Sequence, residues 1–151
     1  MHQEISAGGA PALPRHSDTP PPQSYKTRMK AGNKTTGARL RIVLKPGIAI
    51  GPGKADILAG IQETGSIAAA GRRMGMSYKR AWSLVEVMNT YFAEPMVIAR
   101  RGGNARGGAA LTPMGKKVLA GYRRMETLTE KAISRELDEL GKSLSDMSKR
   151  Q

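Results

Sequence analysis

Residues 66–82 read SIAAAGRRMGMSYKRAW, and these residues carry the strongest structural signal in the sequence. Ser66 and Ser77 each precede a run of helix-forming residues, and a serine hydroxyl can accept a hydrogen bond from an exposed amide at a helix start. The pattern predicts a short helix over 67–74, a tight turn at the glycine that follows it, and a second helix over 78–89. Two short helices joined by a glycine-containing turn are typical of a helix-turn-helix.

The flanking sequence predicts short strands on both sides of this motif. Apolar and basic residues alternate over 38–45, which favours a half-buried strand, and a helix is expected over 54–63. Downstream, two short strands are expected over 96–99 and 109–111. The segment between those strands is rich in Gly and Arg, as in the hairpin wing of a winged helix.

The last third of the chain predicts one long helix that starts at Pro113 and is capped by Thr112. Apolar residues recur along it in steps of three and four, which makes a seam that needs a partner helix. A homodimer is the simplest way to cover such a seam. The residues expected at the dimer interface are Val118, Tyr122, Met125, Ile133, Leu137 and Leu140.

These patterns together predict an α+β, mostly helical fold: a winged helix-turn-helix with a long C-terminal dimerisation helix. Residues 1–36 are rich in Pro and poor in large apolar side chains, so we expect a disordered, basic leader. Residues 37–112 are expected to form the DNA-binding domain. Residues 113–151 are expected to form the dimerisation helix, with a frayed end.

The charge of the chain indicates an anionic partner. The 151 residues contain 25 Lys and Arg against 12 Asp and Glu, a formal net charge of +13. Fifteen of the basic residues and only four of the acidic ones lie within residues 37–125, the part expected to fold. A basic excess on a folded domain favours binding to a polyanion such as double-stranded DNA.

Several classes of protein are excluded by composition. The chain has no Cys, and His2 and His16 both lie in the leader, so neither a thiolate metal site nor a catalytic histidine in the core is expected. No apolar run approaches the roughly 20 residues that a membrane-spanning helix needs, and the leader lacks the apolar core of a signal peptide. We expect a non-enzymatic protein without a cofactor, located in the cytoplasm and associated with the nucleoid.

A resemblance to a known family is carried by residues 65–67, 77–82 (SYKRAW) and 107–112 (GGAALT). These stretches resemble the N-terminal DNA-binding domain of ModE, the molybdate-responsive bacterial transcription regulators. The Leu-Thr-x-x-Gly step at 111–115 is also similar to the winged helix of LysR-type regulators. The resemblance covers about residues 38–131 and implies DNA binding and dimerisation. ModE proteins sense the oxyanion with C-terminal β-barrel domains, for which this chain has no room, so direct molybdate binding is not expected.

The N-terminal end of the second helix of the motif is expected to enter the major groove of DNA. Lys79 and Arg80 there can reach guanine edges or phosphates. Trp82 has two interpretations, a contact to DNA or an anchor in the core under the wing. Arginines of the hairpin suit minor-groove or phosphate contacts. The residues expected to bind DNA are Ser77, Tyr78, Lys79, Arg80, Trp82, Ser83, Arg72, Arg73, Arg100, Arg101, Asn104 and Arg106.

Three functional hypotheses follow. The first is a sequence-specific regulator, acting as a repressor, that binds an inverted-repeat operator as a homodimer. The second is a sequence-tolerant architectural DNA-binding protein of the nucleoid. The third is an oxyanion-binding module that uses the Gly- and Arg-rich hairpin as a nest for the anion.

Overall fold

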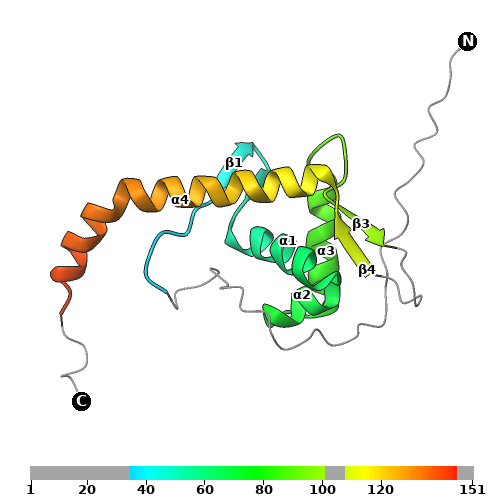
Figure 1. Ribbon diagram of the computed structural model, residues 1–151, viewed down its shortest axis with the longest axis horizontal. Helices are drawn as coiled ribbons and strands as arrows, with labels where there is room; N and C mark the ends of the chain where they lie inside the picture. The colour runs from blue at the N-terminus through cyan, green and yellow to red at the C-terminus, as the bar shows by residue number, and fades with distance from the viewer. Residues whose placement is uncertain (1–34, 101–107, 146–151) are drawn as a thin grey trace, which may run out of the picture.

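The computed structural model describes residues 35–100 and 108–145. In chain order its elements are β1 (Ile42–Lys45), β2 (Ile48–Ile50), α1 (Pro52–Thr64), α2 (Ile67–Arg73), α3 (Tyr78–Asn89), β3 (Val97–Arg100), β4 (Gly108–Leu111) and α4 (Pro113–Lys142). Within these residues the fold is α+β and mostly helical, with two small antiparallel sheets, β1–β2 and β3–β4. Figure 1 shows α1, α2 and α3 gathered beneath one half of α4, whose other half extends away from them.

Hydroxyl caps start three of the helices, as the sequence predicts. The side chains of Ser66, Ser77 and Thr112 each accept a hydrogen bond from the amide three residues further on, at 3.1, 3.2 and 3.0 Å. These caps satisfy amides that lack an intrahelical acceptor. The predicted starts of α2, α3 and α4 are therefore confirmed.

Small residues let α1, α2 and α3 pack closely. A Cβ built on Gly60 would lie 2.8 Å from the Cβ of Ala70, and one built on Gly71 would lie 2.9 Å from the Cβ of Ala81. Gly75 follows α2 with a φ of 67°, a left-handed conformation that favours glycine. The close approach at Gly71 brings the α2 backbone against α3.

The hydrophobic core lies between α1, the inner faces of α2 and α3, and the first turns of α4. Ile57, Leu58 and Ile61 of α1 are fully buried, as expected from their spacing. Tyr122 of α4 is 1% exposed, and its hydroxyl donates a hydrogen bond of 2.7 Å to the carbonyl of Leu40. This bond joins α4 to the segment that enters β1.

The N-terminal hairpin differs from its prediction. The strand expected over 38–45 is confined to β1, and β2, a second strand of three residues, was not predicted. Ile42 pairs with Ile50 across the hairpin. Three residues between turns are too few to show an alternation of their own, so β2 is defined by its pairing partner and by the core that buries Ala49 and Ile50.

Hydrogen bonds connect the β3–β4 sheet to the end of α3 and to the turn between α1 and α2. The side chain of Asn89, the last residue of α3, accepts from the amides of Met96 and Val97 and donates to the carbonyl of Val97, at 2.9–3.0 Å. The amide of Ala109 in β4 donates to the carbonyl of Gly65, between α1 and α2, at 2.8 Å. The orientation of β3–β4 relative to α3 is therefore set by hydrogen bonds.

Helix α4 is the longest element of the structure, with 30 residues. Figure 1 shows that only its first half covers the rest of the fold. Among the described residues, every helix is too short or too polar to cross a bilayer.

Candidate nucleic-acid interface

The start of α3 presents two basic side chains to solvent. Lys79 and Arg80 are exposed, and within the described residues neither takes part in an ion pair. Ser77 caps the helix, so its hydroxyl oxygen already accepts one hydrogen bond, from the amide of Arg80. This geometry leaves the two cations in the first turn of α3 available to hydrogen-bond acceptors outside the chain.

The two arginines of α2 differ in their surroundings. Arg72 is exposed, whereas Arg73 is half-buried and forms an ion pair of 2.8 Å with Glu63 of α1. A phosphate contact by Arg73 would compete with that carboxylate. The structure therefore offers Arg72 more directly than Arg73 to a polyanion.

The remaining residues expected on α3 are less exposed or already bonded. Tyr78 and Trp82 are half-buried and pack against the hydrophobic core. The indole nitrogen of Trp82 is buried and has no acceptor among the residues that the structure describes. Ser83 is exposed, and its hydroxyl donates to the carbonyl of Lys79 at 2.8 Å. These contacts favour the interpretation of Trp82 as an anchor of the core.

The hairpin expected to form a wing is described only in part. Arg100 is exposed at the end of β3, while Arg101, Asn104 and Arg106 lie outside the described residues. Arg100 lines a shallow pocket of about 330 Å³ together with Gln62 and Lys116. Sequence reasoning missed the last two because they come from α1 and α4, which only the tertiary fold brings beside β3.

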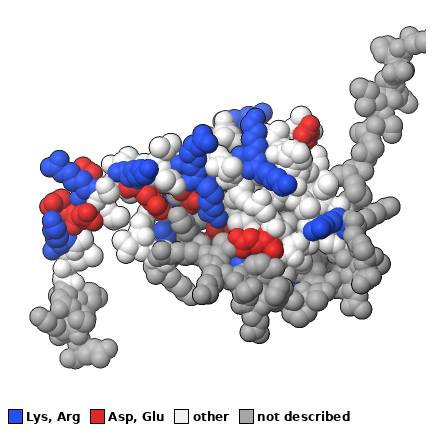
Figure 2. Space-filling view, viewed as in Figure 1, with Lys and Arg blue, Asp and Glu red and all other residues white. Residues whose placement is uncertain are grey.

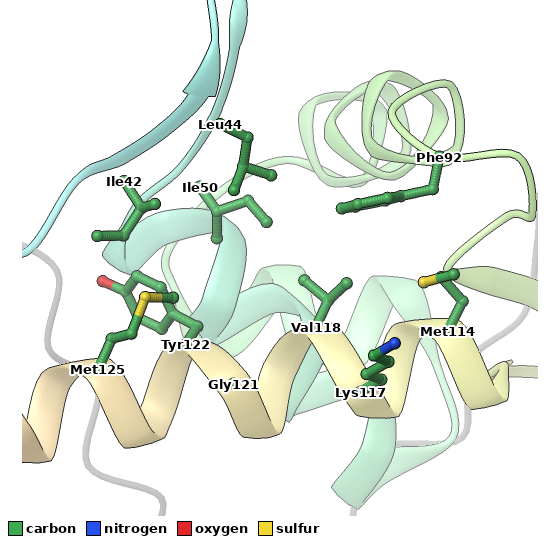
Figure 3. Close-up of a pocket in the computed structure, with 10 residues that line it drawn as sticks. All are labelled: Ile42, Leu44, Ile50, Phe92, Met114, Lys117, Val118, Gly121, Tyr122 and Met125. Atoms are coloured by element: carbon green, nitrogen blue, oxygen red, sulfur yellow. The ribbon is translucent and has the colours of Figure 1, made fainter.

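An apolar groove occupies the surface between β1, β2 and α4. It has a volume of about 300 Å³, and Figure 3 shows its lining side chains converging on one space. The lining residues are Ile42, Leu44, Ile50, Phe92, Met114, Lys117, Val118, Gly121, Tyr122 and Met125. Val118 and Met125, both expected at a dimer interface, therefore line an open surface.

Tyr122 requires a correction, because its ring is buried in the core of the chain itself and offers almost no surface to a partner. The other residues expected at a dimer interface lie further along α4. Ile133 and Leu137 are partly exposed, and Leu140 is 69% exposed. The steps of three and four in the sequence could not separate the part of the seam that packs internally from the part that stays open.

A charged cluster beside the groove joins α4 to α1. Arg123 forms ion pairs with Asp56 at 3.0 Å and with Glu126 at 2.8 Å, and the side chains of both carboxylates are almost fully buried. Burial by itself would lower the pKa of Arg123, but its hydrogen bonds to Glu126 and Asp56 outweigh that effect and raise the pKa above its ordinary value. In this cluster the charges of one basic and two acidic side chains are paired with one another.

The charges of the described surface are unevenly arranged. Figure 2 shows Lys and Arg interspersed with Asp and Glu toward the C-terminal end of α4. By contrast, α3 carries Lys79 and Arg80 at its start, and its first turn contains no acidic residue. Such a distribution favours binding of a polyanion at the start of α3 rather than along the far half of α4.

Comparison with known proteins gives a consistent picture. No protein-family model matches the chain. The chain is 42% identical over 108 residues to the molybdenum-pterin-binding protein MopB of Rhodobacter capsulatus, covering 72% of this chain and 40% of MopB. It is 34% identical over 98 residues to the molybdenum transport protein ModE of Azotobacter vinelandii, covering 65% of this chain and 36% of that protein.

A third relative is the DNA-binding transcriptional dual regulator ModE of Escherichia coli, 32% identical over 82 residues, which are 54% of this chain and 31% of the regulator. The chain thus spans about two fifths or less of the length of these relatives. Their names describe a molybdenum-pterin-binding protein, a molybdenum transport protein and a transcriptional regulator, none of which is an enzyme. Over the shared region the chain is therefore a homologue of the molybdenum-related ModE and Mop proteins.

Proposed function

We propose that this chain is a transcriptional regulator that binds double-stranded DNA through a winged helix-turn-helix formed by α2, α3 and the β3–β4 hairpin. The observation that carries this proposal is the exposed pair Lys79 and Arg80 at the capped start of α3. The N-terminal residues of a recognition helix contact base edges in the major groove. The similarity to a DNA-binding ModE regulator supports the same function.

The second part of the proposal is a homodimer, with a second copy of the chain covering the apolar groove. Ile42 and Leu44 alternate along β1 on the side that faces Val118 and Met125, and Leu44 remains 49% exposed. Further along α4, Leu140 continues the same kind of exposed apolar surface. A two-fold arrangement buries the same surface on both copies and places two α3 helices about 34 Å apart on the DNA.

Capture of genomic DNA by the purified protein, at near-physiological salt and followed by sequencing, tests the function. We expect enrichment of a few sites that share an inverted repeat. The double variant Lys79→Gln/Arg80→Gln should lose this enrichment, because each bidentate base contact discriminates by about 1–3 kcal/mol. The matched control is Arg124→Gln/Arg135→Gln, which removes two exposed cations from α4 and should retain it.

Uniform retention of all genomic fragments would instead favour the architectural function. The basic excess within residues 37–125 supports this second candidate, because phosphate neutralisation alone gives non-specific dissociation constants of about 10⁻⁴–10⁻⁶ M. A specific regulator binds its site about 10³–10⁷ times more tightly than random DNA. Competition between an enriched site and random DNA separates the two functions.

Sedimentation equilibrium tests the dimer. Leu137→Asp/Leu140→Asp and, separately, Val118→Asp should shift the protein to monomer and weaken operator binding. Leu128→Asp places the same charge on an α4 residue that is 59% exposed and lies outside the expected seam. If Leu137→Asp/Leu140→Asp and Val118→Asp both remain as dimeric as Leu128→Asp, the proposed interface is refuted.

A further inference from the structure

A cleft separates the start of α1 from α3. It has a volume of about 270 Å³ and is lined by Arg41, residues 51–54, Met76, Arg80 and Leu84. Arg41 enters from the segment just before β1, whereas Arg80 comes from α3. The cleft therefore collects residues from segments that are distant in the sequence.

The side chains of the cleft favour an anion. Arg41 and Arg80 are both exposed, and among the residues that the structure describes no Asp or Glu lines the cleft. A third cation, Lys54, is held close by, because its ammonium group donates to the carbonyl of Ala49 at 2.9 Å and to the hydroxyl of Tyr91 at 2.7 Å. Two guanidinium groups at one cleft can donate to the oxygens of a phosphate in the fork geometry that this group prefers.

The backbone adds donors to the same place. Gly51 precedes α1 without a side-chain cap, Pro52 has no amide hydrogen, and the first turn contains no acidic residue. The first hydrogen bond of the helix runs from the amide of Ala55 to the carbonyl of Gly51, so helix geometry gives the amides of Gly53 and Lys54 no intrahelical acceptor. The space next to Gly53 is open, since within the described residues no atom beyond its chain neighbours and the adjacent helix backbone lies within 4 Å of a Cβ built there.

We propose that this cleft binds a phosphodiester group of the DNA backbone, next to the groove that α3 reads. The inference rests on the proposed function and extends it, because Arg80 lies in both surfaces. A tetrahedral oxyanion is the ligand that two guanidinium groups and open amides recognise. DNA is the source of that oxyanion because Arg80, which lines the cleft, also belongs with Lys79 to the exposed basic pair at the start of α3. Arg41 thereby becomes a backbone contact that fixes the register of α3 without reading sequence.

The salt dependence of DNA binding tests Arg41. We expect Arg41→Gln to weaken binding to enriched and random duplexes alike, and to make the slope of log K against log salt less negative by about 0.9, the value for one phosphate contact. Lys45→Gln removes an exposed cation from the far end of β1, outside the cleft, and should leave the slope unchanged. Equal slopes for Arg41→Gln, Lys45→Gln and the wild type would overturn the inference.

A second pair of variants separates binding from folding. Gly53→Asp places a carboxylate in the first turn of α1, where it should raise the melting temperature while lowering the affinity for DNA. Gly53→Ala should also raise the melting temperature, because alanine favours the helix, but should lower the affinity much less. Opposite movements of stability and affinity in Gly53→Asp alone support a phosphate at this position. Equal affinities of the two variants would contradict it.

NMR spectra of the full chain distinguish the source of the anion. The amide resonances of Gly53 and Lys54 should shift on addition of duplex DNA, and Arg41→Gln should reduce those shifts. Saturable shifts with inorganic phosphate or molybdate at constant ionic strength, together with an unchanged DNA slope in Arg41→Gln, would make this a site for a free oxyanion and overturn the assignment to DNA. A wild-type chain that binds no DNA at all would refute the proposed function itself.

Discussion

Replacing Tyr122 by Phe removes one hydroxyl from the centre of the fold and leaves the ring in place. The hydroxyl donates to the carbonyl of Leu40 at 2.7 Å, and the side chain is 1% exposed. Losing one buried neutral hydrogen bond costs about 1–1.5 kcal/mol, because the carbonyl is left without its partner. For a domain of this size the melting temperature should fall by about 4–6 °C.

The same residue makes stability depend on alkaline pH. Burial, aided by the negative charge of Glu126, raises the pKa of Tyr122 from 10.0 to about 12. The unfolded chain therefore loses this proton before the folded chain does, and stability falls as pH rises from 10 toward 12. The contribution is fully present below pH 10, and between pH 9 and pH 11 about 1.3 kcal/mol of it is lost.

The two effects combine into one measurement, urea unfolding followed by circular dichroism at several pH values. The wild type should exceed Tyr122→Phe by about 1–1.5 kcal/mol at pH 8, and the difference should shrink toward zero by pH 11. The variant serves as the control for lysines and other tyrosines that ionise in this range. A difference that stays constant from pH 8 to pH 11 would show that the hydroxyl is not buried in the core and would refute the account of the joint between α4 and the β1 segment.

Two further changes test how α3 is positioned, and a third tests the junction between α4 and α1. Gly71→Val should destabilise the fold by about 1–3 kcal/mol in urea unfolding, because a Cβ at this position would lie only 2.9 Å from that of Ala81. The same change should weaken DNA binding in anisotropy titrations. An unchanged stability and affinity would argue against the close approach of α2 and α3. Ser77→Ala should cost about 1 kcal/mol and speed amide hydrogen exchange in the first turn of α3, and unaltered exchange would contradict the cap. Arg123→Met should destabilise the protein by about 3 kcal/mol at pH 7 in calorimetry, because it leaves the buried carboxylates of Asp56 and Glu126 without the cation that pairs with them. An unchanged melting temperature would show that other groups stabilise the two carboxylates.

Most elements of this fold are visible in the sequence because their signals are local. A serine or threonine before a helical run predicted the starts of α2, α3 and α4, and the structure shows each hydroxyl in its hydrogen bond. The spacing of Ile57, Leu58 and Ile61 predicted the buried face of α1. A cap or an apolar period depends on residues within a few positions of one another, so it can be recognised without knowing the rest of the chain.

The candidate site was predictable only for residues whose exposure follows from one helix. Lys79, Arg80 and Arg72 were expected at the surface and are exposed. Trp82 could not be placed, because a ring at the edge of the apolar stripe can face either solvent or core, and the structure packs it against the core.

Tertiary packing decided the features that join distant segments. It brought Arg41 to Arg80, set Lys116 beside Arg100, and buried Tyr122 while leaving Leu140 exposed on the same helix. The local pattern of charge and hydrophobicity thus determined by itself that this is a basic, mostly helical domain with two capped helices, α2 and α3, joined by a short turn. The packing of the elements decides which cations share a cleft and which apolar residues remain exposed to a partner. Contacts between residues far apart in the chain leave no periodic pattern in the sequence, so the sequence alone does not reveal them.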